Sequence, residues 1–150
     1  MDQKEITDKL AHGWIRAYLI FEVLGKPADH VEKAMDMLLD KLSKEKNLEF
    51  LDKKTHKAKA VKKTKNVFTT FAETEILFSN LARLVEIVFD YMPSSIEIIE
   101  PTILKFKNED INALINDLAA KLHHYDALLK KLRLEKAILI KRLTEELKKK

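Results

Sequence analysis

The feature that most constrains this chain is a heptad pattern in its last third. From Ile111 to Leu143, in alternating steps of four and three residues, every position is apolar except Lys136. A 3.5-residue repeat held over about four heptads without glycine or proline is typical of a helix that pairs with another helix along a narrow seam. The predicted seam consists of Ile111, Ile115, Leu118, Leu122, Tyr125, Leu129, Leu132, Lys136, Leu139 and Leu143.

The length of this segment indicates that it needs a partner. A continuous helix over residues 108–150 would reach roughly 60 Å, which is more than a domain of this size covers. A single polar residue such as Lys136 at an a position costs stability but favours a dimer of fixed register. We therefore expect a homodimer formed through a coiled coil. The alternatives are pairing with a different protein and a monomer whose helix folds back over its own sheet.

Residues 1–107 are expected to form one α+β domain. Residues 14–24 and 67–78 alternate between two faces, as strands do, and residues 95–100 form a shorter strand. Apolar residues recur at helical spacing over residues 31–42 and 81–92. Asp29 and Glu32 have the spacing of a capping box at the start of the first of these helices. Residues 47–63 fit either an edge strand or an extended loop.

The predicted order is strand, helix, strand, strand, helix, strand and then the long helix. With right-handed crossovers, this order closes into a ferredoxin-like βαββαβ sandwich, in which a four-stranded antiparallel sheet carries two helices on one face. The first and third strands, at residues 14–24 and 67–78, would be its central pair. They are also the most apolar strands, as a central position requires.

Two segments resemble a known family. They are FDYMPSSIEIIEP at residues 89–101 and VLGKP at residues 23–27. The element order and these segments are similar to a family of small uncharacterised archaeal proteins with a ferredoxin-like domain and a C-terminal helix. The resemblance covers roughly residues 14–128. Its motifs are structural, so it implies a fold and an archaeal source but no activity and no site residues.

The charge of the chain is concentrated in one segment. Residues 52–66 contain seven lysines against one aspartate, a net +6, whereas the whole chain carries only +4. On an extended hairpin these lysines would contact phosphates of RNA or of a ribosome without reading sequence. The alternative is a solvated edge strand, because lysines also protect sheet edges from unwanted pairing. The candidate contacts are Lys53, Lys54, Lys57, Lys59, Lys62, Lys63 and Lys65.

A third group of residues lies on the sheet face predicted to point away from the helices. Four carboxylates fall there, Glu22, Glu73, Glu75 and Glu97, and we interpret them as a solvated face balanced by Arg16 and nearby lysines. Aromatic residues on the same face suggest base stacking, but the glutamates would repel phosphate.

No pattern of residues indicates an enzyme. The sequence predicts no catalytic residue, no metal site and no cofactor. Without cysteine, disulfides and thiolate chemistry are excluded, which fits a cytoplasmic protein, and no apolar run is long enough for a membrane. We expect a non-enzymatic interaction or regulatory protein that dimerises with itself. The alternatives are an RNA- or ribosome-associated factor and a small-molecule-binding regulatory domain with a pocket between sheet and helices.

Overall fold

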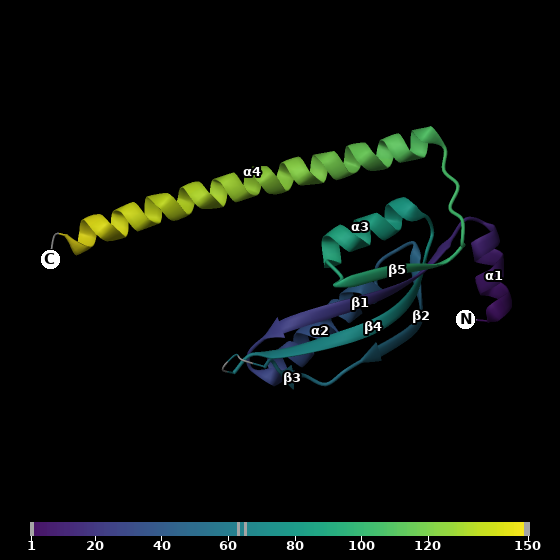
Figure 1. Ribbon diagram of the computed structural model, residues 1–150, viewed down its shortest axis with the longest axis horizontal. Coiled ribbons are helices and arrows are strands. Elements are labelled where there is room, and N and C mark those ends of the chain that lie inside the picture. Colours follow the sequence, from purple (N-terminus) through teal and green to yellow (C-terminus); the bar gives the residue numbers. More distant parts are fainter. Residues whose placement is uncertain (1, 63, 65, 149–150) are drawn as a thin grey trace. The chain divides into compact units, whose positions relative to one another are not determined.

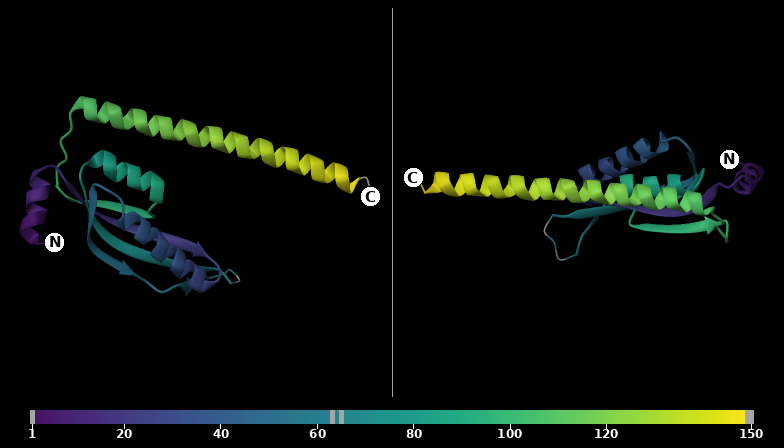
Figure 2. Two further views of the ribbon diagram at one scale, coloured as in Figure 1. Left: turned by 180° about the vertical axis from the view of Figure 1, so that it is seen from behind. Right: turned by 90° about the horizontal axis from the view of Figure 1, so that it is seen from above.

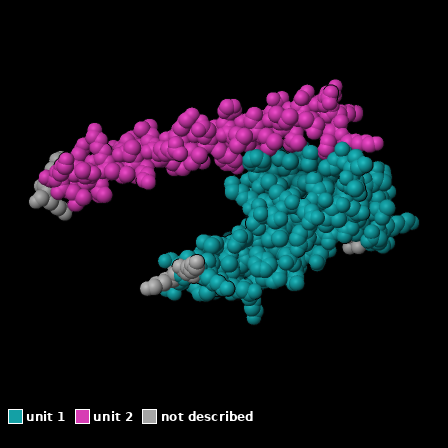
Figure 3. Space-filling view, viewed as in Figure 1, with its two compact units in different colours: residues 1–104 teal, residues 105–150 magenta. Residues whose placement is uncertain are grey.

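The computed structural model describes residues 2–62, 64 and 66–148. The chain divides into two compact units, unit 1 (Met1–Leu104) and unit 2 (Lys105–Lys150) (Figure 3). Unit 2 contains the helix α4 (Asn108–Leu147) (Figure 1). The elements of unit 1 are α1 (Gln3–Ala11), β1 (Ile15–Gly25), α2 (Ala28–Ser43), β2 (Leu48–Thr55), β3 (Lys59–Ala60), β4 (Phe68–Phe78), α3 (Leu81–Tyr91) and β5 (Ser95–Glu100).

The strands form one antiparallel sheet in the order β2-β4-β1-β5, with β3 also paired to β4. Strands β1 and β4 pair along their whole length, from Ile15 opposite Phe78 to Gly25 opposite Phe68. The expectation that the first and third predicted strands are the central pair is therefore confirmed. The described chain is an α+β protein with four helices, the last of which is the predicted long C-terminal helix.

The core lies between the sheet and the helices α2 and α3. Alternate residues of β1 and β4 are buried, as the two-residue period of the sequence predicts. Both helices contribute side chains to the same cluster, and α2 can be seen in front of the sheet in Figure 2. The buried members of this cluster are Ile15, Ala17, Leu19, Phe21, Met35, Leu39, Leu42, Leu48, Ala72, Ile76, Phe78, Leu84 and Ile87.

Two threonines of β4 are buried within this apolar layer. The hydroxyl of Thr74 donates to the carbonyl oxygen of Leu19 at 3.1 Å. The hydroxyl of Thr70 donates to the carbonyl oxygen of His56. Because a buried hydroxyl without a partner is costly, these bonds explain how polar residues are accommodated on the helix-facing side of β4.

Three local expectations are corrected. The N-terminal residues, for which the sequence analysis predicted no element, form α1. Its start has the capping box, because the backbone N–H of Asp2 donates to Glu5 at 3.1 Å. The capping box expected at Asp29 and Glu32 is absent, since α2 begins at Ala28 after Pro27, and Glu32 instead accepts a hydrogen bond from the backbone of Ala58.

The second predicted strand is also more complex than the sequence suggests. The segment after residue 47 is neither one strand nor a loop, but β2 followed by the two-residue strand β3, and both pair with β4. A register shift between Phe50 and Asp52 interrupts the pairing of β2. The lysine-rich segment is thus part of the sheet for much of its length.

Candidate interaction surfaces

Helix α4 is one uninterrupted helix of 40 residues, all of them described, and none of its residues is buried. At 1.5 Å per residue it is about 60 Å long. Ile111, Leu118 and Tyr125 of the predicted seam are half-buried, and Lys136 is exposed. The other six are between 50% and 64% exposed: Ile115, Leu122, Leu129, Leu132, Leu139 and Leu143. The helix therefore presents a long apolar stripe.

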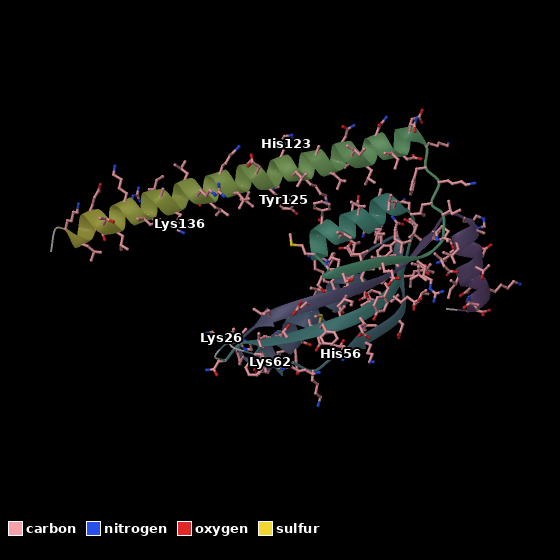
Figure 4. All side chains as sticks on the ribbon, viewed as in Figure 1. Lys26, His56, Lys62, His123, Tyr125 and Lys136 are labelled. Carbon is pink, nitrogen blue, oxygen red and sulfur yellow. The ribbon has the colours of Figure 1, made fainter. Side chains whose placement is uncertain are left out.

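Ion pairs within α4 lie beside this stripe. Lys130 Nζ lies 2.5 Å from a carboxylate oxygen of Asp126, and Lys131 Nζ lies 4.0 Å from Glu135. Both pairs are four residues apart on the solvated surface, where such pairs add a few tenths of a kcal/mol to helix stability. Figure 4 labels Tyr125 and Lys136, which belong to the seam, and His123, which lies outside it.

Some apolar residues of α4 lie off the seam. Leu134 is 63% exposed and Ile138 is 44% exposed, and the two are four residues apart, so they share one side of the helix. Sequence reasoning missed this short row because it considered apolar residues beside the seam only in the first half of the helix. The spacing of Leu134 and Ile138 was the signal that could have found it.

The lysine-rich segment runs along one edge of the sheet and around its end. Lys53 and Lys54 lie on β2, Lys59 lies on β3, and Lys57 and Lys62 lie in the loops that follow these strands. All five side chains are exposed. Lys63 and Lys65 lie outside the described residues.

Backbone contacts hold this segment against β4 and α2. The N–H of His56 donates to the carbonyl oxygen of Phe71 at 2.9 Å, and the N–H of Val61 donates to that of Val67 at 2.9 Å. The N–H of Ala58 donates to Glu32 of α2 at 2.8 Å. The lysines therefore project from a fixed backbone rather than from an unattached loop.

A further lysine, Lys26, joins this group from another part of the chain. It follows Gly25, which pairs with Phe68 of β4, while Ala60 of β3 pairs with Phe68 from the other side. Lys26 is exposed, and Figure 4 shows it beside Lys62 at the same end of the sheet. Only the register of β1 on β4 reveals this proximity, which is why the sequence pattern missed it.

The four carboxylates of the outer face lie where the alternation predicts. Tyr18 pairs with Glu75 on one side and with Glu97 on the other, and Glu22 pairs with Phe71 on β4. Glu22 accepts a hydrogen bond from the hydroxyl of Thr69 at 2.7 Å.

Arg16 connects two strands across the outer face. Its Nε donates to Glu75 of β4, and its guanidinium donates to Glu100 of β5 at 2.9 Å. The hydrogen bond to Glu75, followed by that to Glu100, raises the pKa of Arg16 above its ordinary value. Of the four outer-face carboxylates that Arg16 was expected to balance, it pairs with Glu75.

The aromatic residues of the outer face are largely covered by neighbouring side chains. The imidazole of His56 stacks on Phe71 with ring centroids 4.1 Å apart, and Lys9 Nζ lies 4.4 Å from the ring centroid of Trp14. Burial, with Glu73 as the next cause, raises the pKa of Tyr18. Of the three aromatic residues considered for base stacking, Trp14, Tyr18 and Phe71, two thus already have another side chain against their ring.

An open groove of ≈ 570 Å³ lies between α2 and α3, on the side that faces solvent. Its apolar part is formed by Ala34, Met37, Leu38 and Tyr91, and charged side chains rim it. The space between the sheet and these helices, where a ligand pocket was considered from the sequence, is occupied by the core cluster.

Beside this groove, a polar contact joins α3 to Glu45, which lies in the turn between α2 and β2. The Tyr91 hydroxyl donates to Glu45 at 2.6 Å, and the guanidinium of Arg83 donates to the same carboxylate at 2.6 Å. Burial and the bond to Glu45 raise the pKa of Tyr91 to about 12. The Tyr91 and Arg83 hydrogen bonds lower the pKa of Glu45.

No group of three or more His, Cys, Asp or Glu side chains is arranged to hold a metal ion within the described ranges. In the part of the chain that the structure describes, no helix combines the length and the apolar character needed to cross a membrane.

A family model matches residues 16–149, which is most of the chain. The chain belongs to the MJ0538 family. The family takes its name from a protein of Methanocaldococcus, which agrees with the resemblance to archaeal proteins seen in the sequence. The match begins in β1 and extends through all of α4, so the long helix belongs to the MJ0538 family pattern as much as the sheet does. No curated protein and no solved structure matches the chain.

Proposed function

We propose that the chain is a non-enzymatic interaction protein that forms a homodimer through a coiled coil of two α4 helices. One observation carries this proposal: α4 has no buried residue, although six Leu and Ile side chains of its seam are 50–64% exposed. Fully burying a leucine is worth about 1.5–3 kcal/mol, so a seam of this length favours association. Each dimer would then contain two copies of unit 1.

Within this proposal, unit 1 is a ferredoxin-like domain. The strand order β2-β4-β1-β5 and the helices α2 and α3 in one core support this fold. Helix α1 and the short strand β3 would be additions to it. The cysteine-free sequence supports a cytoplasmic location for the dimer.

The proposal is tested by two matched substitutions. Leu132 lies in the seam and Leu134 lies on the opposite side of the same helix, and their exposed fractions are similar at 50% and 63%. Asp has the same intrinsic helix propensity at both positions. We expect Leu132→Asp to give a monomer by light scattering, because it puts a charge into the seam, and Leu134→Asp to remain a dimer.

The helical content of both variants, measured by circular dichroism, shows whether either has lost α4. If Leu132→Asp keeps the same mass as the unchanged chain, the seam does not form the contact and the proposal is wrong.

A second candidate function is binding of structured RNA by the lysine-rich end of the sheet. The observation that favours it is Lys26, which directly follows β1 and adds a positive charge to a group otherwise formed by the hairpin. Five exposed lysines of the hairpin and Lys26 lie on a fixed backbone. Lysines held in this way can bind the phosphates of RNA through their charge and position, without contacting the bases.

Removing these lysines tests the second candidate. Replacement of Lys53, Lys54, Lys57, Lys59, Lys62 and Lys63 by Ser is expected to lower the affinity for ribosomal RNA at least about tenfold at about 50 mM salt. The control replaces six other exposed lysines by Ser: Lys4, Lys33, Lys41, Lys46, Lys105 and Lys107. Equal losses in both variants would mean that only total charge matters, and unchanged affinity in the first variant would refute the RNA interface.

A further inference from the structure

The charges of α4 are divided between its two halves. Residues 108–127 carry four carboxylates and one lysine, a net charge of −3. Residues 128–147 carry six lysines and arginines and three glutamates, a net charge of +3. Because α4 is a continuous helix, these charges lie on two separate stretches of about 30 Å each.

The dipole of the helix explains only a small part of this division. Its effect is confined to the first and last turns, where acidic residues favour the N-terminal end and basic residues the C-terminal end. Glu109 and Asp110 are in the first turn, but the last turn contains no basic residue. Asp117, Asp126 and the basic residues from Lys130 onward lie outside both turns, so another contact is needed to account for them.

A second copy of α4 in the opposite direction provides that contact. Helices in a coiled coil lie about 8–10 Å apart, which is close to the Debye length of about 8 Å at physiological salt. A parallel pair would place the acidic halves together and the basic halves together. An antiparallel pair places each acidic half along a basic half.

The seam favours the same arrangement. In a parallel pair in register, Lys136 would face Lys136 of the second copy, and two like charges would meet in the apolar seam. An antiparallel pair centred on Ala127 retains every seam contact. It matches Ile111 with Leu143, Ile115 with Leu139, Leu118 with Lys136, Leu122 with Leu132, and Tyr125 with Leu129.

We propose that two α4 helices pair antiparallel, with the twofold axis beside Ala127. This inference rests on the homodimer proposed above and specifies how the second copy is bound. Lys136 then lies against Leu118, from which its flexible stem can reach solvent beside the seam. The two Asn108 residues, where the helices begin, lie about 55 Å apart, so each copy's sheet domain joins the coil at the opposite end.

Distances between spin labels test the direction without disturbing the seam. Ala113 is exposed and lies outside the seam, and the chain has no native cysteine, so Ala113→Cys carries a single label per copy. In the antiparallel pair, residue 113 lies opposite residue 141, and the two labels are expected about 40 Å apart. In a parallel pair they would be less than about 30 Å apart.

Disulfide cross-linking of the full chain gives a second, independent result. A mixture of Leu122→Cys and Leu132→Cys proteins is expected to form the mixed cross-linked dimer, whereas neither variant alone cross-links. Cross-linking of Leu122→Cys with itself, together with a short label distance and a dimeric mass, would overturn the antiparallel direction and leave the homodimer standing. A monomeric mass for the unmodified chain, with no coupling between labels, would overturn both.

Discussion

The hydrogen bond from Tyr91 to Glu45 joins α3 to the turn that follows α2, and it shifts the pKa of both residues. Its loss in Tyr91→Phe is expected to lower the free energy of unfolding by about 1 kcal/mol, which is the usual net value of one hydrogen bond. Urea unfolding measures this change. Tyr125→Phe, on the exposed helix α4, is the control and is expected to leave the stability of unit 1 unchanged.

The same pair has a predicted pH dependence. Because folding raises the pKa of Tyr91 to about 12, its contribution to stability is complete below the ordinary value of 10.0 and is lost as the pH rises toward 12. Folding lowers the pKa of Glu45, so its contribution is present above the ordinary value of 4.5 and is lost as the pH falls through the lowered value. Tyr91→Phe should lack the alkaline loss. An identical alkaline loss in that variant would contradict this role of Tyr91.

Single residues show where sequence reasoning succeeds and where it fails. The outer-face glutamates and Arg16 were placed correctly, because the period of a strand fixes which residues share a face. Lys26 was not connected to the hairpin lysines, because that contact depends on how two strands about 40 residues apart in sequence align. The role of Glu32 was misassigned for a similar reason: its partner, Ala58, is distant in sequence.

Strand β1 contains one leucine that is buried in the core and one that is exposed. Leu19 is fully buried against the helices, and Leu24 is 63% exposed. Leu19→Ala is expected to destabilise unit 1 by about 2–5 kcal/mol, because it removes buried methyl groups and leaves a cavity. Leu24→Ala is expected to change stability by less than about 0.5 kcal/mol.

Chemical denaturation of both variants, followed by circular dichroism, measures this difference. If both variants lost a similar free energy of unfolding, the core would not lie on the helix-facing side of β1.

Elements with a long, regular pattern were the ones predicted from the sequence. The strands β1 and β4, the helices α2 and α3, and α4 each repeat their period over ten or more residues. The short strand β3 has only two residues and no period of its own, and it exists because β4 offers a free edge. Helix α1 is polar, with Ile6 as its one buried residue, so its signal was the capping residues and not an apolar face.

For the whole molecule, the sequence predicted a sheet domain followed by a long helix, and the structure has two such units. That α4 pairs with a partner stays a prediction, and it rests on the seam, which is a local pattern of the sequence. The proposed direction of pairing rests on two further observations: α4 is continuous, and its last turn has no basic residue.

The central claim is that α4 brings two copies of the chain together. The most direct test is the mass of the full, unmodified chain in solution, measured by light scattering after size-exclusion chromatography over a range of protein concentrations. One chain has a mass of 17.4 kDa. We expect a mass of twice that value, which falls toward 17.4 kDa only on strong dilution. A mass of 17.4 kDa at every concentration would contradict it.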